Sequence, residues 1–149
     1  MTNPLAGGAA TVRAAVKVGS PMGMPLRPDV ERLLTRAVVD THVHCFAGKD
    51  NARFPYHPRA PYRPDAPATP QHLLQCMDEA GVDFAIIVHP QPYQDDHRYL
   101  EYCFDVGQSR FKGTCLFFAD QPESLARMPD LVKRLPISAA RIHAYAPDR

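Results

Sequence analysis

The sequence predicts an α/β domain with a parallel β-sheet, and three observations point to this fold class. Short apolar segments with strand character alternate with segments of helical spacing from residue 38 onward. The strand at 84–88 is continuously apolar, as expected of a strand that is covered on both faces. Polar residues follow directly after several strands. Repeated βα units of this kind form parallel sheets with right-handed crossovers.

The first predicted strand runs from 38 to 44 and ends in two histidines, His42 and His44. Side chains alternate between the two faces of a strand, so Asp40, His42 and His44 are expected to share one face. Two imidazoles on one face can hold a single cation, and neutral imidazole suits zinc and other first-row metals. A strand end with two hydrogen-bonded histidines is the alternative, and the short motif leaves both interpretations open.

A proline-rich segment follows this strand, with a proline at every third position. These residues are Pro55, Pro58, Pro61, Pro64, Pro67 and Pro70. Polyproline II has three residues per turn, so the prolines would line one edge of an extended segment that could serve an SH3-like partner. The interleaved aromatic residues Phe54, Tyr56 and Tyr62 instead favour an ordered loop packed on a larger body.

The next two elements have clear boundaries. Thr69 is a good N-cap, Pro70 suits the first helical position, and Gly81 closes the helix. The strand at 84–88 comes next, and His89 followed by proline ends it.

The remaining elements repeat the pattern. Asp95 or Asp96 is expected to cap a second helix that ends near Gly107. Its expected buried stripe consists of Tyr99, Leu100, Cys103 and Phe104. A third strand is expected at 111–118, and a fourth at 137–143. The helix between them begins at Pro122 and is interrupted or kinked at Pro129.

Groups that can bind a metal or move a proton stand where these strands end. They are His42 and His44 on the first strand, His89 on the second, Asp120 after the third and His143 on the fourth. A (β/α)₈ barrel gathers its active site at this edge of the sheet. A doubly wound sheet does the same, but the segment 45–48 lacks the glycine-rich phosphate turn expected there.

Composition restricts the classes of function. The 149 residues carry a net charge of +1, so the composition does not predict a basic surface for binding nucleic acid. No apolar run approaches the roughly 20 residues of a membrane span. Four dispersed cysteines without a Cys-x-x-Cys pair indicate a reducing cytoplasm. Residues 1–37 are interpreted as a flexible leader that has room for a short helix, and residues 38–149 as the domain.

Several motifs together resemble a known family. They are Val-Asp-Thr-His-Val-His at 39–44, Arg-Phe-Pro-Tyr at 53–56, Tyr-Arg-Pro-Asp-Ala-Pro at 62–67, Ala-Gly-Val-Asp at 80–83, Ile-Ile-Val-His-Pro at 86–90 and Arg-Phe-Lys-Gly at 110–113. In order and spacing they are similar to the amidohydrolase superfamily, in particular the amidohydrolase-2 branch that includes the 2-pyrone-4,6-dicarboxylate lactonase type.

The resemblance implies a TIM-barrel hydrolase of a small carboxylated lactone or amide. It implies a divalent metal such as zinc on His42 and His44, although members of this branch vary in metal dependence. Substrate contacts are expected from Tyr62, His89, Arg141 and His143. His89 could instead orient the loop after it, Tyr62 could be a packing residue, and Arg141 could be an ordinary solvated charge.

Length adds a further expectation. A complete barrel takes about 250 residues, whereas residues 38–149 have room for about four βα units. The sequence is therefore interpreted as an N-terminal half, without the strands that carry the other metal ligands and the water-activating aspartate. We expect little activity from it alone, and self-association through open sheet edges. A decarboxylase of the same superfamily and a non-catalytic fragment with a proline-rich interaction segment are the alternatives.

Overall fold

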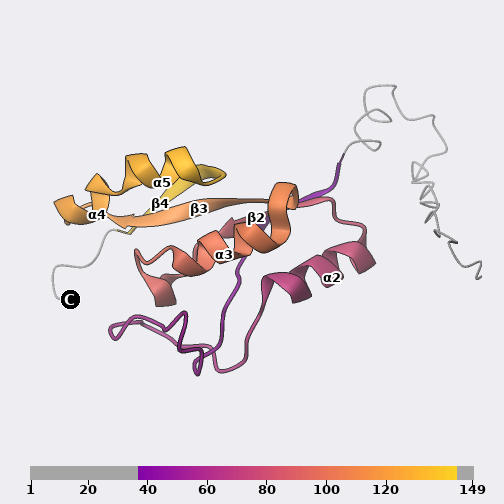
Figure 1. The fold of residues 1–149 in the computed structure, drawn as a ribbon, viewed down its shortest axis with the longest axis horizontal. Coiled ribbons are helices and arrows are strands. Elements are labelled where there is room, and N and C mark those ends of the chain that lie inside the picture. The colour runs from indigo at the N-terminus through magenta and orange to yellow at the C-terminus, as the bar shows by residue number, and fades with distance from the viewer. Residues whose placement is uncertain (1–36, 144–149) are drawn as a thin grey trace, which may run out of the picture. The chain divides into compact units, whose positions relative to one another are not determined.

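The computed structural model describes residues 37–143, so the predicted leader lies outside the described residues except for Ala37. The strands are β1 (Val39–Val43), β2 (Phe84–Val88), β3 (Phe111–Phe118) and β4 (Ile137–His143). The helices are α2 (Pro70–Ala80), α3 (Arg98–Gly107), α4 (Pro122–Ala126) and α5 (Met128–Arg134), with short 3₁₀ turns η1 (Gln91–Tyr93) and η2 (Gln108–Arg110). The strands form one parallel sheet in the order β1-β2-β3-β4 (Figure 1), which confirms the predicted fold class.

The strand order decides where the helices lie. Each strand pairs with the next one along the chain, so right-handed crossovers place every helix on the same face of the sheet. Met77 of α2 and Phe104 of α3 accordingly share one buried cluster with Ala85 and Ile87 of β2. We call this the helix face. The opposite face carries the side chains that the strands direct away from the helices. None of the helices in 37–143 has the length and hydropathy that a membrane crossing requires.

Helix α2 confirms the capping signals of the sequence. The Thr69 hydroxyl accepts a hydrogen bond from the His72 N–H at 3.2 Å, and Pro70 occupies the first turn. Gly81 ends the helix in a left-handed conformation with φ of 68°, which a residue with a Cβ adopts only with strain. The predicted interruption of the next helix is confirmed, but it lies at Arg127, between α4 and α5, and Pro129 stands in the first turn of α5.

Helix α3 begins later than predicted. His97 stands at the N-cap position without a capping hydrogen bond of its own, so the helix starts a residue or two after the predicted point. The Asp96 carboxylate nevertheless accepts a backbone N–H of the first turn, that of Arg98 at 3.1 Å, as a capping side chain does, and it also binds the Arg98 guanidinium at 2.6 Å. The predicted buried stripe is confirmed, since its four residues are each at most 5% exposed.

Two β-bulges interrupt the alternation of side chains. In β1, Asp40 is in register with Ala85, and Val43 is in register with Ile87. Between these pairs, two residues of β1 lie opposite one residue of β2. Residues in register share a face, so Asp40 lies on the helix face and the prediction that it shares a face with His42 and His44 is wrong. A second bulge in β4 separates the pairs Gly113 with Ile137 and Thr114 with Ala139.

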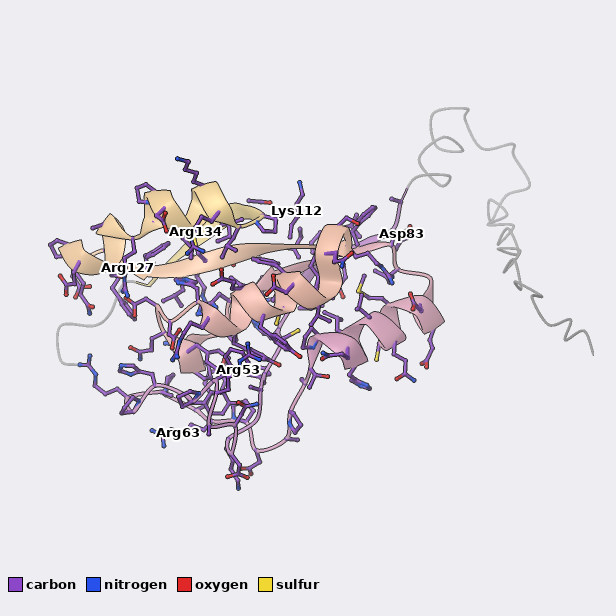
Figure 2. All side chains as sticks on the ribbon, in the orientation of Figure 1. Arg53, Arg63, Asp83, Lys112, Arg127 and Arg134 are labelled. Atoms are coloured by element: carbon purple, nitrogen blue, oxygen red, sulfur yellow. The ribbon has the colours of Figure 1, made fainter. Side chains whose placement is uncertain are left out.

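The proline-rich segment is a packed loop. Phe54 is 7% exposed, with its ring 5.0 Å from that of Tyr99, and the Tyr56 ring lies 5.1 Å from that of Tyr93. The chain reverses at 57–60, where the Ala60 N–H donates to the His57 carbonyl at 2.9 Å. The predicted single polyproline edge is therefore wrong, whereas the alternative of an ordered loop is confirmed; Figure 2 shows Arg53 and Arg63 on this loop.

Candidate active site

The two histidines of the opening strand converge. The Nε2 atoms of His42 and His44 lie 3.4 Å apart, and their rings meet edge to face with centroids 5.0 Å apart. Val43 between them is in register with Ile87 on the helix face, so His44 lies on the opposite face. The bulge turns His42 to the same side as His44. The expected pairing of the two imidazoles is present in the fold.

A backbone contact fixes the tautomer of His44. Its Nδ1 lies 2.7 Å from the Val88 carbonyl oxygen, and because a carbonyl only accepts, Nδ1 carries the proton. The lone pair of the ring is therefore on Nε2, which faces His42. Ligating histidines are commonly oriented by such a hydrogen bond from the second ring nitrogen.

The spacing of the two Nε2 atoms fits a shared metal ion. Two imidazole nitrogens at 2.0–2.1 Å from a tetrahedral zinc are separated by about 3.3–3.4 Å. The Nε2 atoms of His42 and His44 have this separation. Residues 37–143 contain no group of three or more His, Cys, Asp or Glu side chains placed to hold a metal, so this part of the chain offers two protein ligands.

Aromatic rings extend from the histidine pair towards the proline-rich loop. The Phe46 ring lies 6.0 Å from His44 and 6.5 Å from Tyr62. Phe46 and Ala68 exchange two backbone hydrogen bonds, each 2.8 Å long, which hold this part of the loop. Tyr62 is 45% exposed, so its hydroxyphenyl group is accessible beside Phe46. The sequence reasoning missed Phe46, although it is the next alternate position after the two histidines.

His89 is fully buried at the end of β2. Its Nε2 donates to the Gln94 carbonyl at 2.8 Å, which holds the turn after the strand. Gln94 has φ of 52° and ψ of −124°, a sparsely populated conformation for a residue with a side chain. Burial lowers the pKa of His89 to about 3. The loop-orienting alternative describes the ring in this structure, and direct contact of His89 with a substrate stays a prediction.

The neighbour of this ring is a second buried histidine, His97, which the sequence reasoning did not single out. The two rings are in contact, with centroids 4.5 Å apart and planes tilted by 34°. The His97 Nε2 accepts the Leu116 N–H at 3.1 Å, so the ring ties α3 to β3. Burial lowers its pKa to about 4. The signal in the sequence that could have indicated a buried His97 is its position at the start of an amphipathic helix.

Arg141 lies on the same face as His44. Because of the β4 bulge, Arg141 is in register with Leu116 of β3. Leu116 is two residues beyond Thr114 and so shares its face, and Thr114 is in register with Val88 of β2. This face is opposite to the helix face, as the predicted role requires. His143 occupies the register position beside Phe118 at the end of β4. The structure does not describe the His143 side chain, so its predicted role stays a prediction.

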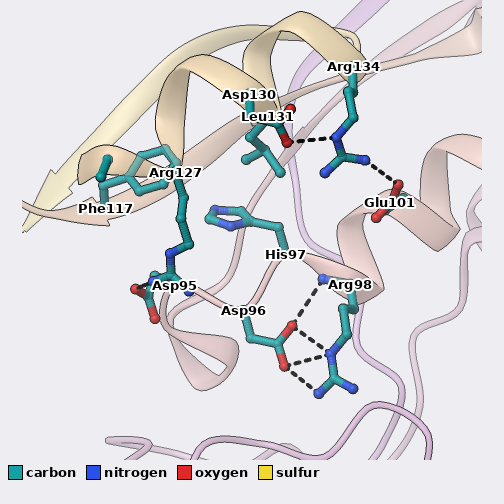
Figure 3. A pocket seen from close by; sticks show the side chains of 11 residues that line it. Asp95, Asp96, His97, Arg98, Glu101, Phe117, Arg127, Asp130, Leu131 and Arg134 are labelled. Atoms are coloured by element: carbon teal, nitrogen blue, oxygen red, sulfur yellow. Dashed lines mark hydrogen bonds and ion pairs between the residues drawn. The ribbon is translucent and has the colours of Figure 1, made fainter. Parts of the chain in front are cut away.

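A spacious cleft of the described part of the chain lies elsewhere. It measures about 680 Å³ and is formed by the start of α3, by Phe117 and by the helices α4 and α5 (Figure 3). Its carboxylates all pair with arginines: Asp95 with Arg127, Asp96 with Arg98, and Glu101 and Asp130 with Arg134. Each carboxylate of this cleft is thus already engaged by an arginine, so the cleft offers no unpaired acid for proton transfer.

Comparison with known proteins gives a likeness in fold. No family model and no curated protein sequence matches the chain. A solved structure of a probable 2-pyrone-4,6-dicarboxylic acid hydrolase from Acinetobacter baumannii, with citric acid bound, superposes with a TM-score of 0.60 at 19% identity, over 76% of this chain and 42% of the other. This chain has the fold of part of a (β/α)₈ barrel. The partial barrel thus spans less than half the length of that protein.

Two further solved structures are more distant. A candidate 2-pyrone-4,6-dicarboxylic acid hydrolase from Pseudomonas putida gives a TM-score of 0.46 at 24% identity, over 63% of this chain and 33% of the other. A protein from Agrobacterium tumefaciens in its apo form gives 0.48 at 18% identity, over 74% of this chain and 38% of the other.

Proposed function

We propose that the partial barrel is the metal-binding portion of an amidohydrolase-type hydrolase that acts on a small carboxylated lactone or amide. The observation that carries the proposal is the 3.4 Å separation of the His42 and His44 Nε2 atoms. The fold likeness to the Acinetobacter baumannii protein and the sequence motifs at 39–44 and 62–67 support it.

His42 and His44 would hold a divalent cation such as zinc through Nε2. Such a cation supplies Lewis acidity, which activates water and polarises a substrate carbonyl. Val88 contributes through its carbonyl, which keeps the His44 proton on Nδ1 and so leaves Nε2 free to bind. Working metal sites use about three protein ligands, and residues 37–143 offer two. We therefore expect weak metal binding and little turnover from this chain alone.

The proposed substrate class follows from Arg141, on the same face of the sheet as His44, and from Tyr62 of the proline-rich loop. The Arg141 guanidinium, on the same face as His44, can bind a carboxylate through two parallel hydrogen bonds. Tyr62 lies beside Phe46 and presents an exposed ring that can stack on an unsaturated substrate. These groups suit a small acid that carries a planar ring or an amide.

Metal binding by the purified chain is the first test. Titration with Zn²⁺ or Co²⁺, followed by calorimetry and by Co²⁺ absorption, should show one site that His42→Ala and His44→Ala each abolish. His72→Ala removes an exposed histidine of α2 and should leave the site intact. Equal metal affinity in all four proteins would contradict the assignment of the pair.

Product analysis separates the two reactions that this superfamily suggests. The chain is incubated with 2-pyrone-4,6-dicarboxylate and with simple lactones and amides, with and without added metal. Release of a ring-opened acid supports the hydrolase, whereas release of carbon dioxide identifies a decarboxylase. Turnover that persists in His42→Ala and His44→Ala would contradict both.

A further inference from the structure

A second pocket lies at the carboxyl edge of the sheet and does not include the two histidines. It measures about 140 Å³ and opens between the segment after β2, the turn after β3 and the proline-rich loop. The residues of its polar lining are Arg59, Gln91, Gln94, Asp120 and Gln121. Phe118, which is 3% exposed, gives the pocket an aromatic wall.

The pocket contains a cation and an anion that do not pair. Within residues 37–143, no ion pair involves the Arg59 guanidinium or the Asp120 carboxylate. By contrast, the arginines of the large cleft bind carboxylates, and Arg63 donates to backbone carbonyls. Three glutamine side chains add amides, which both donate and accept hydrogen bonds. Residues of opposite charge thus line the same pocket.

The walls of this pocket are held in place. The Gln94 side-chain amide donates to the Arg59 carbonyl at 3.3 Å, and the His57 N–H donates to the Pro92 carbonyl at 2.8 Å. These bonds join the loop to the segment after β2. The strained backbone of Gln94 is fixed by the buried His89. Strained residues that the surroundings hold in this way cluster at ligand sites.

We propose that this pocket binds a small zwitterion, a free α-amino acid of about the size of alanine. Arg59 would bind the carboxylate and Asp120 the ammonium group, while the amides of Gln91 and Gln121 complete the polar contacts. The volume of about 140 Å³ suits a small ligand. Sites for larger ligands measure about 300–1,000 Å³, so a nucleotide does not fit.

The experiment is a titration of the full chain with L-alanine, followed by NMR shifts and calorimetry. Propionate and ethylamine are run in parallel, because each lacks one of the two charges. Arg59→Gln and Asp120→Asn should each weaken alanine binding by about tenfold or more, the effect of losing a charged hydrogen-bond partner. Arg59→Lys keeps the charge without the planar fork and should recover part of the affinity.

Matched controls separate this site from general charge effects and from the proposed hydrolase. Lys133→Gln and Glu123→Gln remove exposed charges on α5 and α4 outside the pocket and should leave binding unchanged. His42→Ala should also bind alanine normally, so failure of the metal site would not affect this result. The proposal is overturned if folded wild-type protein shows no alanine-dependent shifts, or if propionate binds as tightly as alanine and Asp120→Asn has no effect.

Discussion

Acid should destabilise this fold in the pH range where histidine ordinarily titrates, because His89 and His97 are buried as neutral rings. Burial lowers the pKa of His89 from 6.5 to about 3, and the adjacent His97 contributes to the decrease. Burial lowers the pKa of His97 to about 4. The Asp96 carboxylate raises the pKa of both histidines, and the Asp95 carboxylate raises that of His97. The Arg127 guanidinium lowers the pKa of His97 further.

The sign follows from proton binding. The unfolded chain protonates both histidines near pH 6.5, whereas the folded protein takes up these protons only near pH 4 and below. The free energy of unfolding therefore falls as the pH decreases through this interval. Each pH unit removes about 1.4 kcal/mol per histidine. The unfolded histidines are half protonated at pH 6.5, so acidification from pH 6.5 to 5 should remove about 3 kcal/mol in total, a large share of the roughly 5–15 kcal/mol of a typical domain.

Urea unfolding at about pH 7.5, 6.5 and 5, followed by far-ultraviolet circular dichroism, measures this loss. His97→Gln keeps an acceptor for the Leu116 N–H but cannot be protonated, so about half of the pH dependence should disappear. His72→Gln changes an exposed histidine and should behave like the wild type. An identical decrease in His97→Gln and in wild type would refute the explanation.

Three further substitutions test the packing. Gly113→Ala places a Cβ 2.7 Å from the Phe104 ring and 2.9 Å from the Ile87 carbonyl oxygen, so the free energy of unfolding in a urea titration should fall by about 1–3 kcal/mol. An unchanged urea midpoint would contradict the close packing of α3 on the sheet. Thr69→Ala removes the α2 cap and should cost about 1 kcal/mol by the same method, and no loss would mean that the cap is dispensable. Phe54→Ala should cost about 3 kcal/mol and expose the proline-rich loop to proteases, whereas wild-type resistance would indicate other anchors.

The sequence was sufficient to predict most of the fold, because the deciding interactions are local. The cap at Thr69, the closing Gly81 and the apolar run at 84–88 depend only on near neighbours, and all are present. The predicted start of α3 was early by a residue or two, although the Asp96 carboxylate does accept the Arg98 N–H of the first turn.

The candidate site was predictable only in part. The approach of His42 to His44 follows from their spacing, but the face of Asp40 depends on a bulge, which the alternation rule does not anticipate. The bulge in β4 similarly decides the face of Arg141. The contact of His89 with His97 joins residues from different elements, and only the tertiary structure brings them together.

The docking of the proline-rich loop gives this protein an intrinsic optical reporter. Phe54 and Tyr56 of the loop pack against the rings of Tyr93, Tyr99 and Tyr102. The ring centroids of Tyr93 and Tyr99 are 5.3 Å apart, and those of Tyr99 and Tyr102 are 5.9 Å apart. The sequence contains no tryptophan, so these coupled phenols dominate the near-ultraviolet circular dichroism. Detachment of the loop would change that signal while the far-ultraviolet spectrum of the sheet and helices persists, and so its opening can be followed without a label.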